Sequence, residues 1–551
     1  MSPHWIQQYH PLRVRYCRHR KKKDSRQEVE NPPFFNIEAL QKRLSRPIPL
    51  AVTAILLLLA LFNLSLWTRG WANFQFSYLI VAVTFILFGF AFYGSSFYQR
   101  FVRLPLIWQF LIIFVLAFSL RALFLPHSPA LSEDIWRITR RADHLLAGDI
   151  PYKDFDVKKP PLYIYMIGGL GYVFGVGDVQ YRIIFSLVDA LNAGLLLIIP
   201  VAIRSRERTV SPYWKYGAFL YAVGPVAILE SGLAGHYDPM CVLVVNIALI
   251  SVFYCKGLLA GILLGAGFAM KVYPMFLFPG FFLFLKEWRS RVFFVIGFFI
   301  VPVVVFIPTL VQAPGSFMDY VGEQALTWYF NPSIQGSLTF LLEDTLPNQM
   351  GINPPGWINL NPLFLIFFFA VSGLFLVNVA GKKKAGVGWF RLMGSIMFIQ
   401  LFFLVVFIGG VYYKTADSRI IPYAIFMIVA DVALIIFLFL QYKHAINHAK
   451  DRAFAGPTSL ATEDNRGLFA KMFDPIDANT LILSSLFILM LLVLTASQIH
   501  PWYFLWFFPF IVGVRDRYLL FWLFVYFTVF PVMFYWYQEF AHLWISSPFA
   551  G

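Results

Sequence analysis

Charged residues are scarce in this chain of 551 residues, where Asp, Glu, Lys and Arg together make up 13%. Soluble domains carry roughly 25% of such residues, which excludes a soluble protein of this length, whether of one domain or of several. Hydrophobic residues reach 59%, and 62 positions are Phe. Because apolar runs fill the chain, the composition also excludes a disordered protein and indicates an all-α polytopic membrane protein.

Cysteine is rare, and a secretory leader pattern is missing. Among the three cysteines, Cys241 and Cys255 stand on one expected helix, roughly 21 Å apart at about 1.5 Å per residue, which is too far for a disulfide. The first 46 residues are polar, and the first apolar run is long enough to span a bilayer. We therefore expect neither a disulfide framework nor a cleaved leader.

Acidic residues are outnumbered by basic ones, 29 to 44, which gives a net charge of +15. Residues 1–50 hold 11 basic and four acidic side chains, so much of the excess precedes the first apolar run. Basic segments beside a span stay in the cytoplasm near anionic lipid. We expect residues 1–47 to form a cytoplasmic tail, and we expect no nucleic-acid partner.

Apolar runs of about 20 residues, enough to cross a bilayer, recur along the chain. They predict about 13 transmembrane helices near 48–68, 75–97, 105–125, 181–203, 213–232, 239–255, 292–310, 361–380, 387–411, 419–440, 479–497, 501–514 and 518–537. The expected organisation comprises the tail 1–47, a two-helix extension 48–97, a catalytic core 105–310 with an outer loop 126–180, a second outer loop 311–360, and C-terminal helices 361–551 with a cytoplasmic linker 441–478.

Two apolar stretches fit a simple span badly. Residues 161–177 follow Pro160, begin with Pro161 and contain five glycines, while residues 257–285 are too long and are interrupted near Lys271 and Pro274. Lys and Arg side chains collect on the cytoplasmic side of membrane proteins. That rule makes 161–177 a juxtamembrane helix on the outer face and 257–285 a re-entrant or broken helical hairpin, with irregular backbone facing a protein cavity.

Charged residues are dense in the outer loop 126–180. If residues 133–146 are helical, Arg137 and Arg141 lie about 60° and 20° from Asp134 around the helix axis, and Asp143 lies on the opposite side. Cations on the face of Asp134 would keep its carboxylate ionised near neutral pH. The alternative is a helix cap with ordinary surface ion pairs.

These motifs resemble those of GT-C fold glycosyltransferases, a superfamily that includes lipid A aminoarabinose transferases, protein O-mannosyltransferases and polyprenyl-phosphomannose-dependent mannosyltransferases. The resemblance is carried by Asp134-x-x-Arg137, Asp143, Gly148, Pro151-Tyr152, Lys159-Pro160-Pro161-Leu162-x-x-Tyr165, Lys271-x-Tyr273-Pro274 and Gln498-x-His500-Pro501-Trp502-Tyr503. Two features depart from it: the extension 48–97, and Ile138 where Tyr is frequent.

The resemblance implies transfer of a sugar, a hexose such as mannose, from a polyprenyl-phosphate donor to a hydroxyl of a glycan, lipid or protein acceptor. The reaction would take place on the outer face of the plasma membrane. Asp134 occupies the position of the catalytic base, Glu133 is its substitute, and Asp143 matches a second acidic position. A lipid phosphate would be held by basic side chains, for which the candidates are Lys159, Arg182, Lys271 and His500.

Lys271 is the sharpest of these candidates, because a cation at membrane depth is costly without a partner. A salt bridge to Asp189 or Asp431 is the alternative to a lipid phosphate. His500 could equally be an interfacial histidine without a ligand. The candidates for substrate contacts are Arg137, Arg141, Tyr152, His236, Asp238, Trp328, Tyr329 and Tyr503.

His236 and Asp238 could also be half of a metal site, but two ligands alone are weak evidence. No cofactor is therefore expected with certainty, and a divalent metal stays possible. Two other functions compete with the transferase: a lipid-linked oligosaccharide polymerase or ligase, and a lipid or solute transporter. A transporter should show internal repeats and midplane charges on broken helices, and only the interruption at Lys271 fits.

Overall fold

The computed structural model describes the chain over residues 50–68, 83–126 with short gaps, 134–204, 214–326, 334–340, 360–380, 394–403, 475–495 and 500–514, with isolated residues between them. All the elements bounded within these ranges are helices. Glu133, Trp328 and Tyr329, the expected span 518–537, the tail 1–47 and most of the linker 441–478 lie outside the described residues.

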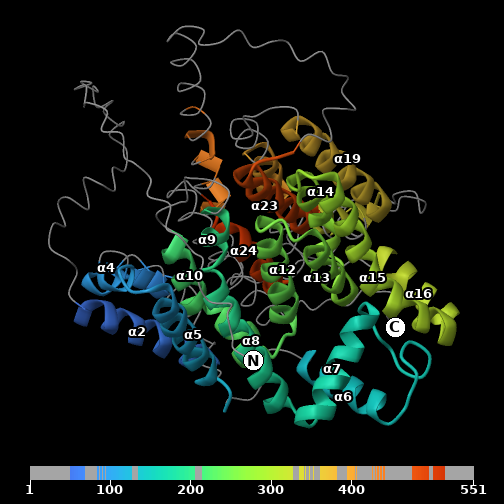
Figure 1. Ribbon diagram of the computed structural model, residues 1–551, viewed down its shortest axis with the longest axis horizontal. Helices are drawn as coiled ribbons and strands as arrows, with labels where there is room; N and C mark the ends of the chain where they lie inside the picture. Colours follow the sequence, from blue (N-terminus) through green and yellow to red (C-terminus); the bar gives the residue numbers. More distant parts are fainter. Residues whose placement is uncertain are drawn as a thin grey trace, which may run out of the picture. The chain divides into compact units, whose positions relative to one another are not determined.

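The helices before the break at Lys271 are numbered as in Figure 1. Their bounds are α2 Leu50–Thr68, α4 Ser96–Phe101, α5 Leu106–Ala122, α6 Asp134–Leu146, α7 Pro161–Phe174, α8 Asp178–Leu195, α9 Ile199–Arg204, α10 Trp214–Val223, α11 Pro225–Ala227, the π-helix η2 Ile228–Ala234, α12 Asp238–Phe253 and α13 Gly257–Met270. After the break follow α14 Pro274–Phe284, α15 Trp288–Gln312, α16 Pro314–Leu326, α17 Ile334–Phe340, α19 Leu360–Ala380, α23 Ala478–Thr495, the 3₁₀ helix η4 Pro501–Phe507 and α24 Phe508–Ile511.

The helices α13 and α15 pack along a row of glycines spaced four residues apart. A Cβ on Gly257, Gly261 or Gly265 would lie 2.2, 2.2 or 2.1 Å from a backbone carbonyl oxygen of α15. Small residues with this spacing let two helix backbones approach closely in membrane proteins. The glycine row therefore makes α13 and α15, which lie side by side in Figure 1, a tightly joined pair.

The stretch 257–285 is interrupted where the sequence predicts it. Helix α13 ends at Met270, Lys271 has extended backbone, and α14 begins at Pro274, whose missing N–H costs nothing in the first turn of a helix. The two legs contact each other and α12. The broken helical hairpin is thus confirmed, whereas the side of the membrane on which its ends lie stays a prediction.

Three described helical segments are long and apolar enough to cross a membrane: Asp178–Arg204, Trp288–Gln312 and Ala478–Thr495. The segments Lys215–Val223 and Pro225–Ala234, bent by 47°, add a fourth if they form one span. Helix α7 and several others are shorter apolar helices. The 13 expected spans therefore stay a prediction.

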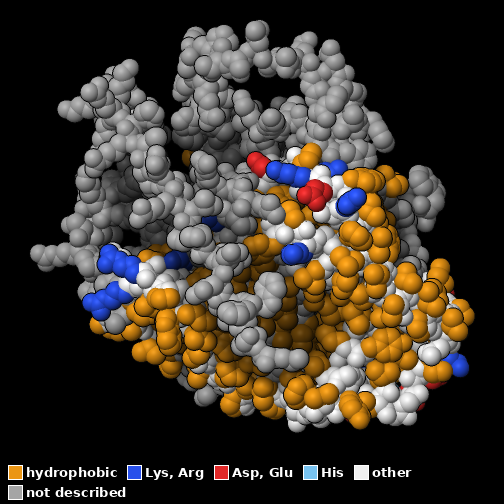
Figure 2. All heavy atoms as spheres, in the orientation of Figure 1, with side chains coloured by type: hydrophobic (Ala, Val, Ile, Leu, Met, Phe, Trp, Pro, Cys, Tyr) orange, Lys and Arg blue, Asp and Glu red, His pale blue; other side chains and the backbone are white. Residues whose placement is uncertain are grey.

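Helix α15 contributes to a broad apolar surface. Many of its large hydrophobic side chains are exposed, among them Phe293, Ile296, Val304 and Ile307. Figure 2 shows hydrophobic side chains over a wide area of one face, with charged side chains outside it. A surface of this kind suits contact with lipid rather than water.

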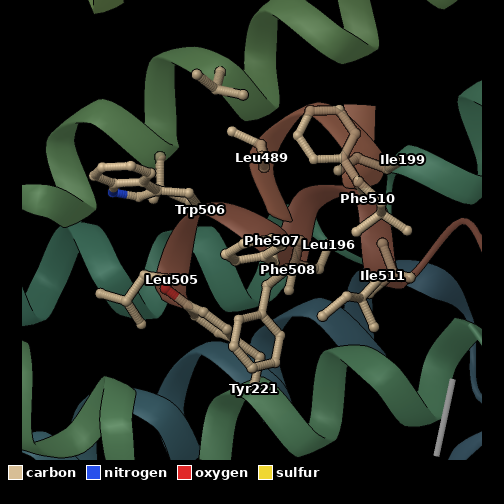
Figure 3. Close-up of a cluster of buried hydrophobic side chains, with 14 of the residues drawn as sticks. Leu196, Ile199, Tyr221, Leu489, Leu505, Trp506, Phe507, Phe508, Phe510 and Ile511 are labelled. Carbon is tan, nitrogen blue, oxygen red and sulfur yellow. The ribbon is translucent and has the colours of Figure 1, made fainter. Parts of the chain in front are cut away.

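The C-terminal segment is packed into the core. Figure 3 shows Trp506, Phe507, Phe508, Phe510 and Ile511 meeting side chains from α8, α9, α10 and α23. These aromatic residues of η4 and α24 are buried. The packing brings residues near position 500 against helices from the first half of the chain.

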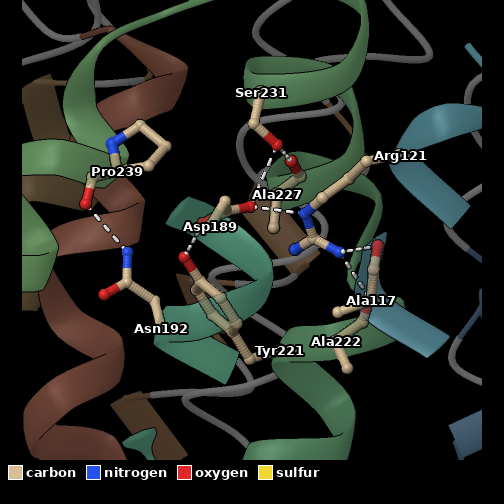
Figure 4. A network of polar contacts seen from close by, with 9 residues as sticks. All are labelled: Ala117, Arg121, Asp189, Asn192, Tyr221, Ala222, Ala227, Ser231 and Pro239. Atoms are coloured by element: carbon tan, nitrogen blue, oxygen red, sulfur yellow. Dashed lines mark hydrogen bonds and ion pairs between the residues drawn. The ribbon is translucent and has the colours of Figure 1, made fainter. Parts of the chain in front are cut away.

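An ion pair is buried between α5 and α8. Arg121 Nε lies 2.6 Å from Asp189 Oδ2, and neither side chain is exposed. Tyr221 and Ser231 donate hydrogen bonds to the same carboxylate (Figure 4). The suggested salt bridge between Lys271 and Asp189 is therefore wrong, because Asp189 is occupied by an arginine from the neighbouring helix.

Candidate active site

Helix α6 begins the candidate site. It spans Asp134–Leu146, close to the expected 133–146. Arg137 lies one turn after Asp134, with 3.6 Å between its Nη1 and Asp134 Oδ1. Arg141 turns away instead, because its Nε donates to the backbone carbonyl of Asp156. Only one of the two expected cations therefore pairs with Asp134.

Asp143 lies on the opposite side of α6, as the helix geometry predicts, and its side chain is exposed. Within the part of the chain that the structure describes, no hydrogen bond or ion pair joins Asp143 to another candidate residue. The loop after α6 is closed by His144, whose Nδ1 lies 2.7 Å from Asp149 Oδ2. The carboxylate of Asp154 adds a hydrogen bond from the backbone N–H of Ile150. Asp149 and Asp154 thus hold this loop, while the role of Asp143 stays a prediction.

His236 joins α6 to the π-helix η2. Its Nδ1 lies 3.4 Å from Asp134 Oδ2, and its Nε2 lies 3.5 Å from Glu230 Oε2. The backbone places the ring, since the N–H groups of Gly235 and His236 both donate to the carbonyl of Glu230. Gly235 has φ +70, and a Cβ there would lie 2.8 Å from Arg182 and from Ile135. Glycine is needed at this turn for both reasons.

Tyr152 holds the backbone beside Lys159. Its hydroxyl donates to the Lys159 carbonyl over 2.6 Å, and its ring packs against Phe317 and Tyr320 of α16. Tyr152 is itself buried. The hydroxyl donates to the main chain, and a substrate contact of Tyr152 stays a prediction.

Lys271 is enclosed by one carboxylate and several aromatic rings. Its Nζ lies 2.7 and 2.9 Å from the two carboxylate oxygens of Asp238, and Trp506 Nε1 donates to Asp238 Oδ1 over 2.7 Å. The rings of Tyr237, Tyr503 and Trp506 surround the ammonium, with centroids 4.9–5.2 Å away. The expected alternatives, Asp189 and Asp431, are wrong as partners, because Asp238 at the start of α12 is closer to the break.

Lys271 is one of several buried cations among the described residues. Arg121, Arg182 and Arg291 are buried as well. Arg182 donates to the backbone carbonyls of Gly232 and Phe124. These bonds hold the backbone of η2 in place. The phosphate contact that the sequence suggests for Arg182 stays a prediction.

His500 approaches from the far end of the chain. It precedes η4, and its ring meets the edge of Tyr503 at 5.3 Å between centroids. Its charge environment includes Lys159, Asp134, Lys271 and His236. The fold thus brings residues from four separate motifs into one region, as the resemblance implied.

The electrostatics of the region favour an ionised Asp134. Burial raises the pKa of Asp134, but the surrounding basic side chains, His236 and Lys159 first among them, outweigh it and the pKa falls below the usual carboxyl value. Burial lowers the pKa of Lys159 to about 8, and Lys271 adds to this. Burial likewise lowers the pKa of His236 to about 4. At neutral pH the site holds a carboxylate, a neutral histidine and a charged lysine.

Glu230 and Trp506 belong to this region and are missed by sequence reasoning. Glu230 has a side chain with no exposed area. An acidic residue inside an apolar run was the available signal, because such residues are rarely retained in membrane helices without a role. Trp506 gives no such signal, since tryptophan is ordinary at membrane interfaces.

The site does not form an obvious metal centre. Among the residues that the structure describes, no group of three or more His, Cys, Asp or Glu could hold a metal ion. His236 and Asp238 both lie here, but Asp238 is bonded to Lys271 and Trp506. The two residues therefore do not fit the half-site considered from the sequence.

A comparison with known families places part of this chain. Residues 170–406 match the sequence model of glycosyltransferase family 87. The stretch is less than half of the chain; it contains His236 and Lys271, but it begins after Asp134 and ends before His500. No curated protein matches the chain. The similarity indicates glycosyltransferase activity in general, and together with the apolar helices it indicates a membrane protein.

Proposed function

We propose that this protein is an inverting glycosyltransferase that takes a sugar from a polyprenyl-phosphate donor and transfers it to an acceptor hydroxyl. The observation that supports this most is the arrangement around Asp134. Its carboxylate is about one-third exposed and stands between Arg137 and His236, with Lys159 close enough to lower its pKa. A base beside cations is what sugar transfer from a phosphate ester requires.

Asp134 acts as the general base in this proposal. It accepts the proton of the acceptor hydroxyl as the hydroxyl oxygen attacks the anomeric carbon, and the bond from that carbon to the phosphate oxygen breaks. Displacement by a single nucleophile inverts the configuration at the carbon. The lowered pKa of Asp134 keeps the carboxylate ready at neutral pH.

Lys159 and His500 stabilise the departing phosphate. Lys159 is charged below about pH 8, and a neutral His500 donates one N–H. Lys271 is paired with Asp238. It therefore contributes less to stabilising the phosphate unless the phosphate displaces the Asp238 carboxylate. Tyr503, stacked on Trp506 with centroids 4.2 Å apart, borders this region and is suited to contact the sugar.

The finer features belong to the same proposal: about 13 spans in a GT-C arrangement, a cytoplasmic N-terminus, and a site on the outer face of the plasma membrane. Helix α7 then lies along the outer surface. Mannose is the first sugar to test, because the mannosyltransferases of the superfamily share this loop pattern.

The test is sugar transfer by the purified protein. Synthetic polyprenyl-phosphate [14C]mannose and a membrane glycolipid extract are supplied, and both labelled product and free polyprenyl phosphate are measured. We expect transfer by the wild type and loss of it in Asp134→Asn. Transfer from a nucleotide sugar without any lipid donor would contradict the proposal.

A further inference from the structure

Glu230 is the buried carboxyl group of the site that sugar transfer does not use directly. It has no exposed area and belongs to the π-helix η2. The ring of His236 lies between the two carboxyl groups. Its Nε2 is 3.5 Å from Glu230 Oε2, and its Nδ1 is 3.4 Å from Asp134 Oδ2. π-Helical turns are frequent at functional sites, since the extra residue re-aims the side chains.

The geometry restricts where protons can lie. A neutral imidazole has one N–H and one bare nitrogen, yet both nitrogens of His236 face carboxyl oxygens. A bare nitrogen and an ionised carboxylate repel each other, so one of the two carboxyl groups must carry a proton if the ring is neutral. Asp134 is partly exposed and has Arg137 and Lys159 beside it, whereas Glu230 has no exposed area. The proton therefore belongs on Glu230.

We propose that Glu230 is a positioning residue for the transfer reaction: as a neutral acid it donates to His236 Nε2, which fixes the N–H of the ring on Nδ1, where it donates to Asp134. This inference rests on the proposed function, in which Asp134 is the base. The Nδ1–H group then donates to Asp134 Oδ2, while Arg137 lies beside Oδ1.

The surrounding turn holds this arrangement in place. The backbone N–H of His236 donates to the Glu230 carbonyl over 2.8 Å, so the two residues move together. Arg182 grips the same turn at the Gly232 carbonyl. A Cβ at Gly232 would lie 2.7 Å from the backbone oxygen of Arg121. These contacts fix the backbone that carries the His236 ring.

Other charged groups face the same region and set the background for any pH effect. They come from every element packed against the ring: Arg137 on α6, Lys159 before α7, Asp238 on α12, Lys271 at the break and His500 before η4. None of them is changed by a substitution at Glu230. A shift in the pH profile of a Glu230 variant therefore reports on His236 and Asp134.

Two variants separate positioning from mere support. In Glu230→Gln the side-chain amide still donates an N–H to Nε2, so kcat should stay within about threefold of the wild type. In Glu230→Met the donor is lost, so kcat should fall about 10- to 100-fold with an unchanged donor KM. The acid limb of the pH profile should also move to higher pH in Glu230→Met, because Asp134 loses an oriented N–H.

Asn246→Leu is the matched control. It removes another fully buried polar side chain, one bonded to Asn192 on α8, and it should leave kcat and the pH profile unchanged. If Glu230→Met behaves like this control, or if Glu230→Gln is as damaging as Glu230→Met, the proposal is overturned.

The ring itself can be observed without any activity. The chain has ten histidines, and loss of one signal in His236→Gln identifies His236 in the spectrum of the [15N]histidine-labelled protein. We expect the neutral Nδ1–H form in the wild type and its loss in Glu230→Met. An Nε2–H form in the wild type would overturn the proposal even if Glu230→Met does not fold. Absence of sugar transfer by the wild type would instead refute the proposed function.

Discussion

At the scale of single residues, the charged side chains of the candidate site lie against specific partners. Asp238 is neutralised by Lys271 and receives a further hydrogen bond from Trp506. Asp134 is treated differently, since its neighbours lower its pKa while about one-third of its side chain stays exposed. In the proposed mechanism the accessible carboxylate of Asp134 is the reactive one, and the enclosed carboxylate of Asp238 supports the structure.

Asp134→Asn tests this distinction. The substitution is nearly isosteric, so donor binding should persist, while loss of a general base should lower kcat about 10²–10⁴-fold. The matched control is Asp143→Asn, which changes an exposed aspartate on the other side of the same helix. Measured kcat and donor KM of both variants decide between them: if Asp143→Asn abolishes turnover and Asp134→Asn keeps a third of it, the base has been misassigned.

Lys271→Met tests the buried ion pair. Removing one partner leaves Asp238 charged and enclosed, which should cost about 3–5 kcal/mol of stability. The double variant Lys271→Met with Asp238→Asn should recover much of the lost thermal stability. If the donor KM stays raised in the stable double variant, Lys271 also binds the lipid phosphate; an unchanged KM would limit Lys271 to its structural role.

Lys159 sets the alkaline limit of activity. Its pKa is lowered to about 8, so the side chain is charged below that value and becomes neutral as the pH rises through it. The donor KM should therefore increase above about pH 8, while Asp134 remains ionised throughout. Lys159→Arg keeps its charge at higher pH, and its KM should stay flat there. A wild-type KM that does not change between pH 7 and 10 would argue against this role.

At the scale of elements, backbone contacts decide how closely the helices pack. The glycine row on α13 lets α15 approach until the backbones touch. The same row is visible in the sequence as glycines at every fourth position, yet a spacing alone does not say which helix it meets. The broken hairpin is more predictable, because Pro274 lacks a backbone N–H and would interrupt one continuous helix over 257–285.

Gly261→Leu tests the α13–α15 contact. Its Cβ would lie 2.2 Å from the carbonyl oxygen of Phe294, and overpacking of this kind costs about 1–3 kcal/mol or more. Gly169→Ala on α7 is the control, since a Cβ there meets nothing within 4 Å and alanine favours a helix. Thermal unfolding in detergent should show a lower midpoint for Gly261→Leu than for the wild type, and an unchanged midpoint for the control. Equal midpoints for Gly261→Leu and the wild type would exclude a tight contact.

The π-helix could not be predicted from the sequence, although Glu230 inside an apolar run was a signal for a residue with a role. The residues of η2 read as the end of an ordinary apolar run, and no periodicity marks an extra residue in a turn. The position of His236 near Asp134 is also a tertiary fact, because 102 residues of the numbering separate them. By contrast, Asp134, Arg137, Lys159 and Lys271 were each singled out by charge in an apolar chain.

At the scale of the whole molecule, the distribution of basic residues predicts the orientation. We expect the segment 311–360 outside and the linker 441–478 in the cytoplasm. A single cysteine at Met318, whose side chain is 60% exposed on α16, should react with an impermeant maleimide added to intact cells. A single cysteine at Ser459 should react only after lysis. The reverse pattern would invert every assignment of sides.

The hydrogen bond between Trp506 and Asp238 joins positions 268 residues apart. At a synthesis rate of roughly 5–20 residues per second, Trp506 is therefore added about 13–54 s after Asp238. Lys271 follows only 33 residues later, so the two charges can neutralise each other while the ribosome is still far from Trp506. A nascent chain that ends before His500 then holds the Lys271–Asp238 ion pair, but it lacks His500 and the rings of Tyr503 and Trp506. In the proposed mechanism, the site is therefore complete only once the chain has been synthesised past His500 and η4.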